Sequence, residues 1–296
     1  MKVGFIGLGV MGAPMAANLA RAGYIVTGYD HAAGRMAALA DVGVRTAASV
    51  ADALAGADAV ITMLPDSPDV EAVAFGPDGV LEQVAPGTLY ADMSTVRPET
   101  ARRLAEAGAA KGVRVLDAPV SGGEPGAVEG RLSIMVGGAA EDVTVARPLL
   151  DVLGATVTHV GPAGSGQTVK AANQLVVGGT YALIAEALVL LEASGADGRT
   201  GLDVLAGGLA GSRILELKRA SMVAREFAPG FRIDLHHKDM GIALAAAREA
   251  DVALPMTGLV AQLVAAARTQ GYGSLDHSAL LKVVENLSGP AERSPA

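Results

Sequence analysis

The fold is decided by VGFIGLGVMGAPMAANLARAGYIVTGYD, residues 3–30. This stretch holds a short apolar run, a glycine turn at 7–12, a helical pattern and a second apolar run. Such a pattern predicts a strand, a turn, a helix and a second strand. Gly7 permits the tight turn, Gly9 lets a ligand approach the backbone, and Gly12 lets the helix pack closely on the strand. The stretch therefore predicts the first βαβ unit of a parallel sheet.

The glycine turn also predicts a dinucleotide site, with a glycine-rich turn that binds nothing as the alternative. The helix after it would offer free N–H groups and a positive dipole end to a pyrophosphate. Asp30 follows the second strand about 20 residues beyond the glycines, where a carboxylate can accept hydrogen bonds from both ribose hydroxyls and would repel a 2′-phosphate. NAD is therefore the favoured cofactor, and NADP is the alternative because Arg35 could soften that exclusion. Asp30 could also cap a helix over 32–40. The expected cofactor contacts in the turn are Gly7, Leu8, Gly9, Val10, Met11 and Gly12.

Apolar runs and helical patterns continue to alternate up to residue 163. The predicted strands lie at 57–64, 88–93, 113–118, 132–136 and 156–160. The predicted helices between them include 98–111 and 141–153, the second broken or kinked by Pro148. These repeats are typical of a Rossmann-type dinucleotide-binding domain, here 1–163, with a largely parallel sheet and helices on both faces.

The segment GSGQTVKAANQLVVGGTYALIAEALVLLEAS, residues 164–194, predicts one long interdomain helix. Beyond it, helices are predicted at 201–209, 212–225, 235–250, 255–269 and 276–287, with Pro255 in a first turn and Asp276 as an N-cap. Residues 195–296 are therefore expected to form an all-helical C-terminal domain. The expected fold class is an α/β dinucleotide-binding domain followed by an all-α domain.

The amino-acid composition of the chain argues against several classes of protein. The 296 residues are 51% hydrophobic and 18% charged, which suits two folded domains and is inconsistent with disorder. A net charge of −8 without basic runs argues against nucleic-acid binding. The lack of cysteine excludes thiolate sites and disulfides, and the five histidines have no metal-ligand spacing, so no metal is expected. The uncharged part of the long helix is shorter than the roughly 20 residues that span a bilayer, so a soluble, cytoplasmic protein is expected.

Further ligand contacts are expected at the carboxyl ends of the strands, where parallel sheets bind their ligands. Leu64 and Pro65 could pack on an adenosine or nicotinamide ring there. Thr95 could form a hydrogen bond with the cofactor. Ordinary turn chemistry is the alternative for all three residues.

The segment 117–131 is expected to be a long loop with an unusual composition. Ser121, Gly122 and Gly123 would present backbone N–H groups with little obstruction from side chains. This arrangement predicts a nest for a substrate carboxylate, and a flexible glycine linker is the alternative.

Three polar residues lie near the start of the long helix. Lys170, Asn173 and Gln174 are spaced i, i+3 and i+4, so their side chains share one face. A lysine in such a position is usually a solvated surface residue, and Gln174 is expected to be structural. The shared face predicts a polar cluster at the junction of the two domains.

Four blocks of this sequence match blocks of a known protein family, in the same order along the chain. They are GFIGLGVMGAPMAANL at 4–19, DMST at 92–95, DAPVSGGEPGAVEGRLSIMVGG at 117–138 and GSGQTVKAANQ at 164–174. Nearly the whole chain thereby resembles the β-hydroxyacid dehydrogenases, which include 3-hydroxyisobutyrate dehydrogenase and tartronate semialdehyde reductase. The similarity to tartronate semialdehyde reductases is the greater one, on EPGAVEG at 124–130, SRILE at 212–216, PGFRIDLHHKD at 229–239 and LDHSAL at 275–280.

The resemblance implies roles for individual residues. Lys170 matches the catalytic lysine of the family and Asn173 its substrate-binding asparagine. Ser121, Gly122 and Gly123 match the substrate-binding loop. The cofactor-contacting positions of the family are matched by Leu64, Pro65, Thr95 and Lys238, the last from the second domain. For Lys238, a salt bridge with its charged neighbours is the alternative.

The resemblance also implies the reaction, which is reduction of tartronate semialdehyde (2-hydroxy-3-oxopropionate) to glycerate by hydride transfer, with Lys170 as general acid. Within the family, 3-hydroxyisobutyrate dehydrogenase is the alternative. Outside it, the alternatives are a non-catalytic cofactor-binding module and an imine reductase, and the presence of Lys170 with Asn173 disfavours both. The expected partners are a small anionic hydroxyacid or aldehyde-acid and further copies of the chain, in a homodimer or homotetramer.

Overall fold

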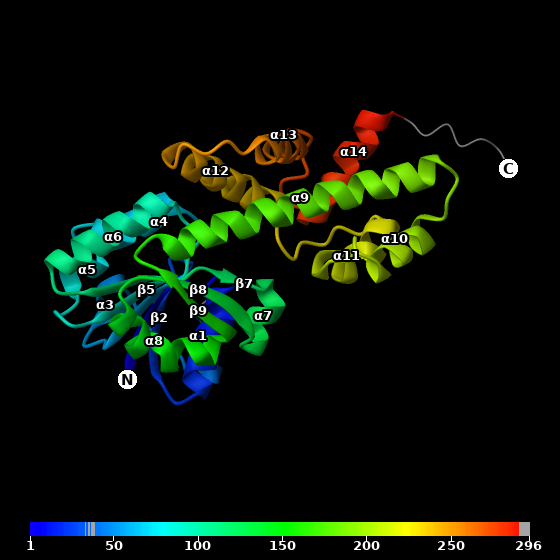
Figure 1. Ribbon diagram of the computed structural model, residues 1–296. Helices are drawn as coiled ribbons and strands as arrows, with labels where there is room; N and C mark the ends of the chain where they lie inside the picture. Colours follow the sequence, from blue (N-terminus) through cyan, green and yellow to red (C-terminus); the bar gives the residue numbers. More distant parts are fainter. Residues whose placement is uncertain (33, 35, 37–38, 290–296) are drawn as a thin grey trace. The chain divides into compact units, whose positions relative to one another are not determined.

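The computed structural model describes residues 1–32, 34, 36 and 39–289 (Figure 1). Arg35, and with it part of the helix expected over 32–40, lies outside the described residues. The chain divides into two compact units, Met1–Lys170 and Ala171–Ala296. The boundary between them falls inside the long helix α9 (Ser165–Ala193).

The first unit is built on a nine-stranded sheet in the order β3-β2-β1-β4-β5-β6-β8-β7, with β9 paired to β8. The pairs from β3 through β6 are parallel, as is β8 with β9, whereas β8 runs antiparallel to β6 and β7. The strands are β1 (Lys2–Ile6), β2 (Ile25–Tyr29), β3 (Arg45–Thr46), β4 (Ala59–Thr62), β5 (Leu89–Asp92), β6 (Arg114–Asp117), β7 (Val120–Ser121), β8 (Leu132–Gly137) and β9 (Gly154–Gly161). The predicted Rossmann-type sheet is confirmed.

The strand register brings the ends of five strands to one edge of the sheet. Ile6 lies opposite both Tyr29 and Thr62. Thr62 lies opposite Asp92, which in turn lies opposite Asp117. The segments that follow these strands, which hold most of the predicted ligand contacts of this unit, therefore begin side by side.

Helices cover both faces of the sheet, because its central strands are apolar on both sides (Figure 1). On one face, α1 and α8 bury Met15 and Leu149; on the other, α4 and α6 bury Val70 and Leu104. The helices of this unit are α1 (Gly12–Arg21), η1 (Ala40–Val42), α3 (Val50–Leu54), α4 (Ser67–Phe75), α5 (Val80–Gln83), α6 (Pro98–Ala110), α7 (Gly123–Glu129), α8 (Ala140–Leu153) and the start of α9.

The helix expected to be broken or kinked by Pro148 is not broken, because it is continuous over Ala140–Leu153 with Pro148 inside it. The segment 117–131 is not a long loop, because it holds the end of β6, the short strand β7 and the helix α7.

The second unit is helical, as predicted. It comprises the rest of α9 with α10 (Gly198–Gly207), α11 (Arg213–Ala224), α12 (Ile233–Glu249), α13 (Pro255–Thr269), η2 (His277–Ala279) and α14 (Leu280–Ser288). Pro255 lies in the first turn of α13, and the Asp276 side chain accepts a hydrogen bond from the Ser278 N–H, so both predicted helix starts are confirmed. The last helix differs, since its first turn is the separate 3₁₀ helix η2.

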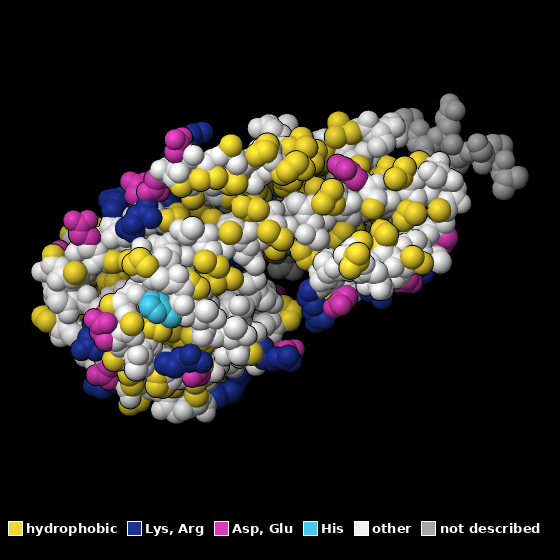
Figure 2. Space-filling model, in the orientation of Figure 1, with side chains coloured by type: hydrophobic (Ala, Val, Ile, Leu, Met, Phe, Trp, Pro, Cys, Tyr) yellow, Lys and Arg dark blue, Asp and Glu magenta, His cyan; other side chains and the backbone are white. Residues whose placement is uncertain are grey.

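Within the described chain, α9 is the one helix long and apolar enough to cross a membrane by length and composition alone, with a mean hydropathy of 1.8. Tyr181, Ala185 and Leu188 of α9 are buried in the core of the helical unit. Three other apolar side chains of α9 are exposed at seven-residue intervals, Val176 by 61%, Leu183 by 61% and Leu190 by 68%. This spacing places the three side chains on one stripe of the helix. Figure 2 shows that the visible face of the helical unit carries many hydrophobic side chains.

Candidate active site

The glycine turn leaves no space for side chains beneath it. Gly7 has a φ of +96°, and a Cβ at this residue would lie 2.3 Å from the carbonyl oxygen of Met63. A Cβ on Gly12, the first residue of α1, would lie 1.9 Å from the carbonyl oxygen of Gly7. The turn is thus a bare backbone cradle at the N-terminus of α1, and such a cradle fits the pyrophosphate of a dinucleotide.

The side chains of the turn point in different directions. Leu8 is buried in the core below the turn, and Met11 packs against the same core. Val10 faces outward and is 65% exposed. The carbonyl oxygen of Gly9 accepts the Ala13 N–H at 3.0 Å, which begins the hydrogen bonding of α1. Leu8 and Met11 would therefore meet a ligand through their backbone.

Asp30 fastens the end of β2 to the glycine turn. Its Oδ2 accepts the Leu8 N–H at 2.8 Å, and its Oδ1 accepts the Ala32 N–H at 2.8 Å. The residue is only 5% exposed. Each carboxylate oxygen can accept more than one hydrogen bond, so these contacts are compatible with the predicted ribose contact. The hydrogen bond that Asp30 accepts from the Ala32 N–H is of the kind expected of a helix cap.

A buried hydrogen-bond network joins the turn after β4 to the turn after β5. Ser94 Oγ accepts the Leu64 N–H at 2.9 Å and donates to Asp92 Oδ1 at 2.6 Å. Thr62 Oγ1 donates to the same oxygen at 2.7 Å. Ser94, Asp92 and Thr62 are buried, whereas Pro65 is exposed and Thr95 is partly exposed. The Leu64-Pro65 turn and Thr95 therefore stand on a shared buried support.

The start of α9 is anchored to the end of β6. Asp117 Oδ1 accepts the Gly164 N–H at 2.8 Å, and Asp117 Oδ2 accepts the Gln167 N–H at 2.9 Å. Burial raises the pKa of Asp117 to about 6, against the lowering effect of these two donors. A Cβ on Gly166 would lie 2.7 Å from the Asp117 carbonyl oxygen, so this turn of the helix can approach the sheet only without a side chain. Lys170 follows one turn later and is 6% exposed.

The predicted carboxylate nest has a different local structure from the one expected. Ser121 is paired to Ser133 at the end of β7, and Gly123 is the first residue of α7. Gly122 and Gly123 have φ values of +138° and +63°, which only glycine adopts without strain. Asn18 Nδ2 donates to the Ala127 carbonyl oxygen at 2.8 Å, so α7 is fastened to α1. The three predicted residues form a strand-to-helix corner rather than a flexible linker.

In the helical unit, Asn173 and Lys238 belong to one polar cluster. Asn173 Nδ2 donates to Gln174 Oε1 at 2.8 Å, and Gln174 Nε2 donates to Asp239 Oδ2. Lys238 Nζ lies 3.2 Å from Asp239 Oδ1. Gln174 and Asp239 are 4% and 2% exposed, respectively. The salt bridge considered for Lys238 is therefore present, and its acidic partner is buried.

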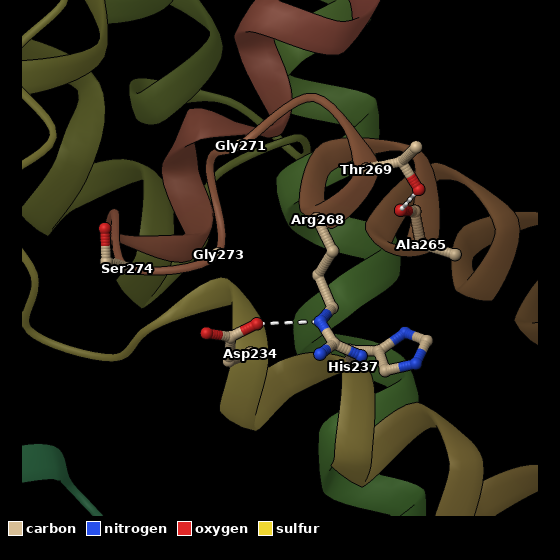
Figure 3. A pocket seen from close by; sticks show the side chains of 8 residues that line it. All are labelled: Asp234, His237, Ala265, Arg268, Thr269, Gly271, Gly273 and Ser274. Atoms are coloured by element: carbon tan, nitrogen blue, oxygen red, sulfur yellow. Dashed lines mark hydrogen bonds and ion pairs between the residues drawn. The ribbon is translucent and has the colours of Figure 1, made fainter.

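A separate pocket of about 620 Å³ opens in the helical unit (Figure 3). Arg268 Nε donates to Asp234 Oδ1 at 2.7 Å between its walls. Burial and the neighbouring Arg268 lower the pKa of His237, which also lines it. The full lining is Asp234, His237, Ala265, Arg268, Thr269, Gly271, Gly273 and Ser274. None of the predicted site residues lines this pocket.

The predicted set omits several residues that hold the site together. Asp117, Gln167 and Asp239 are buried and hydrogen-bonded to segments that carry predicted site residues. For Gln167 a signal existed in the sequence, because it stands three residues before Lys170 and so falls on the same side of the helix. Asp117 and Asp239 have no comparable local signal.

Two family models together match most of the chain. Residues 2–161 match the NAD binding domain of 6-phosphogluconate dehydrogenase. Residues 164–284 match the NAD-binding domain family of NADP-dependent 3-hydroxyisobutyrate dehydrogenase. The chain therefore carries the NAD-binding domain that the glycine turn predicted.

Relatives of known activity cover nearly the full length. The chain is 44% identical to 2-hydroxy-3-oxopropionate reductase of Escherichia coli (strain K12), over 96% of this chain and 97% of the relative. It is 40% identical to 2-(hydroxymethyl)glutarate dehydrogenase of Eubacterium barkeri, over 98% and 96%. The solved structure of Mycobacterium tuberculosis 3-hydroxyisobutyrate dehydrogenase with L-serine has a TM-score of 0.88 and 34% identity, over 96% of this chain and 99% of that one. The chain belongs to the 3-hydroxyisobutyrate dehydrogenase-like family of β-hydroxyacid dehydrogenases, which are NAD(P)-dependent oxidoreductases.

Proposed function

We propose that the protein reduces 2-hydroxy-3-oxopropionate (tartronate semialdehyde) to glycerate, with NADH as the preferred reductant. The observation that carries the proposal is the buried Lys170, one turn beyond the helix start that Asp117 anchors to the sheet. The substrate choice is supported by the 44% identity to a 2-hydroxy-3-oxopropionate reductase over 96% of the chain. The alternative within the family is 3-hydroxyisobutyrate oxidation, which the similarity to a solved dehydrogenase of that name supports.

Lys170 carries the proton chemistry in this proposal. A bound reduced nicotinamide supplies hydride to the aldehyde carbon. As an ammonium group, Lys170 donates a proton to the developing alkoxide and stabilises its negative charge. As the neutral amine, it accepts the hydroxyl proton in the direction of oxidation.

The other predicted residues bind and orient the substrate. Gly122 and Gly123 lack side chains at the corner after β7, so their backbone can approach the substrate carboxylate, and Ser121 adds a hydroxyl donor. Asn173 uses its Nδ2 toward Gln174 and so keeps its Oδ1 available to accept from a substrate hydroxyl. Anchoring both ends of a small acid fixes its carbonyl for attack.

The preference for NADH rests on Asp30. A carboxylate at the end of β2 accepts hydrogen bonds from ribose hydroxyls and repels a 2′-phosphate. The negative charge of Asp30 therefore disfavours NADPH. Lys238 would contribute a contact with the cofactor from the helical unit.

The test is a comparison of specificity constants. Turnover of tartronate semialdehyde and of methylmalonate semialdehyde would be measured with NADH and NADPH in parallel. We expect the highest kcat/KM for tartronate semialdehyde with NADH. A higher kcat/KM for the methylated substrate would overturn the substrate assignment, and a higher value with NADPH would overturn the cofactor preference alone.

We also infer a cytoplasmic homodimer or homotetramer. The exposed stripe of α9 at Val176, Leu183 and Leu190 supports packing against another copy, since contiguous apolar surface is seldom left in water. Leu183→Glu would place a charge on the stripe, and Leu209→Glu, at a fully exposed position outside α9, is the matched control. Sedimentation should show dissociation for the first variant only. An unchanged oligomer in Leu183→Glu would exclude the stripe as the interface.

A further inference from the structure

Gln167 makes two side-chain hydrogen bonds that bracket Thr95. Gln167 Oε1 accepts the Val96 N–H at 3.1 Å, and Gln167 Nε2 donates to the Ser94 carbonyl oxygen at 2.8 Å. Gln167 is 0% exposed, so water does not compete for either bond. The residues before and after Thr95 are therefore both held by one side chain from the first turn of α9.

Through its side chain and its backbone N–H, Gln167 is the centre of a longer network. On one side, Ser94 Oγ accepts the Leu64 N–H at 2.9 Å. On the other, the Gln167 N–H donates to Asp117 Oδ2 at 2.9 Å. The turns after β4 and β5 and the end of β6 are thus connected, through Gln167, to the helix that carries Lys170.

We infer that Gln167 is a positioning residue, which sets the place of the cofactor-contacting Thr95 against the general acid Lys170. This inference rests on the proposed function. Gln167 lies one turn before Lys170, so a shift of its turn moves Lys170 with it. Thr95 can move only if Ser94 or Val96 gives up a buried bond. In hydride transfer with coupled proton transfer, a displacement of about 1 Å costs up to about 10²-fold in rate.

Only an uncharged side chain of this length, with one acceptor and one donor, satisfies both neighbours. Asn is one methylene shorter and cannot reach both backbone groups from the same Cα. Leu leaves the Ser94 carbonyl and the Val96 N–H buried without a partner. An ionised Glu can accept from Val96 N–H but cannot donate to Ser94, whereas a protonated Glu can do both.

The experiment compares Gln167→Leu and Gln167→Glu with the wild type, and Val169→Ala is the control at an exposed position nearby in α9. Kinetics with the best substrate of the wild type, NADH titration by fluorescence and thermal unfolding are measured for each. For Gln167→Leu we expect kcat to fall about 10- to 100-fold with little change in substrate KM. NADH binding should weaken about three- to tenfold, through the displaced Thr95. The primary deuterium isotope effect on kcat should rise, since the hydride step becomes limiting.

Gln167→Glu provides a test that a purely structural role would not pass. Burial and the carboxylates of Asp117 and Asp92 raise the pKa of a carboxyl group at this position, and the Lys170 ammonium opposes them. We expect activity relative to the wild type to be low at pH 8 and to recover as the pH falls to 6, where the protonated carboxyl donates to Ser94.

The possible outcomes separate the two proposals. If the wild type turns over no hydroxyacid or aldehyde-acid, the proposed function fails, and the NADH titration still tests Gln167. If the wild type is active and folded Gln167→Leu retains its kcat and NADH affinity within twofold, the positioning role is overturned. A Gln167→Glu variant with a constant activity ratio across pH overturns it as well, even where Gln167→Leu does not fold.

Discussion

Replacing Gly12 by alanine should disable the cofactor site by moving the glycine turn. The new Cβ would lie 1.9 Å from the Gly7 carbonyl oxygen, and real contacts of this kind start at 3.0 Å. Gly7 cannot simply retreat, because its N–H is bonded to the Tyr29 carbonyl at 2.9 Å and its backbone lies so close to Met63 that a Cβ on it would be 2.3 Å from the Met63 carbonyl oxygen. Overpacking of this kind costs about 1–3 kcal/mol of stability. The loss of one hydrogen bond to a pyrophosphate, worth about 1.5–3 kcal/mol, weakens binding roughly 10- to 150-fold.

NADH titration by fluorescence, with thermal unfolding in parallel, would measure both effects. The matched control is Gly179→Ala in α9, since a Cβ there meets nothing within 4 Å. This control should bind NADH like the wild type and should be at least as stable. The reasoning about the turn would be refuted by a folded Gly12→Ala protein whose affinity for NADH stays within twofold of the wild type.

Three further predictions concern the acid, α9 and pH. Lys170→Ala should lower kcat about 10²- to 10⁴-fold while NADH affinity changes less than threefold; near-normal turnover would remove Lys170 from the acid role. Gly178→Ala should be about 1–3 kcal/mol less stable to urea than Gly179→Ala, because its new Cβ would lie 2.9 Å from His236 Nε2. The gain in helix propensity is the same for both variants, so equal stabilities would contradict the close packing at Gly178. The pKa of Asp117 is raised from 3.8 to about 6 in the folded protein, so the folded state binds more protons than the unfolded state between these pH values. As the pH rises through this window, Asp117 therefore lowers the free energy of unfolding, by up to about 3 kcal/mol. The free energy of unfolding, measured with urea between pH 4 and 7, should therefore fall more steeply with pH, or rise less, for the wild type than for Asp117→Asn. Parallel pH curves for the two proteins would contradict the raised pKa.

The parts of the fold that depend on local pattern were predictable from the sequence. The glycine turn, its flanking strands and the long helix each have a signal within a few residues, and all three are present. Strand ends were less predictable: the apolar run at 57–64 outlasts β4, which ends at Thr62. Hydrophobic runs report burial, whereas a strand ends where its backbone pairing ends.

The segment after β6 could not be predicted from its composition. Glycine and proline at its start favour a loop, yet Gly123–Glu129 is helical because the segment is held by distant groups, including Asn18 on α1. Gln167 is a similar case, since its partners Ser94 and Val96 lie some 70 positions earlier in the chain. A single sequence gives no measure of such pairings.

Asp30 accepts hydrogen bonds from the backbone and also carries the charge that would repel a 2′-phosphate. These two roles constrain how the cofactor preference of this chain can be redesigned. Engineers who wish to admit a 2′-phosphate would first remove this carboxylate. Doing so would also withdraw the acceptor of the Leu8 and Ala32 N–H groups and loosen the turn that is proposed to bind the pyrophosphate. A successful swap of cofactor should therefore keep a short acceptor at this position, such as asparagine, whose one carbonyl oxygen retains one of the two bonds, and introduce the positive charge at a neighbouring residue.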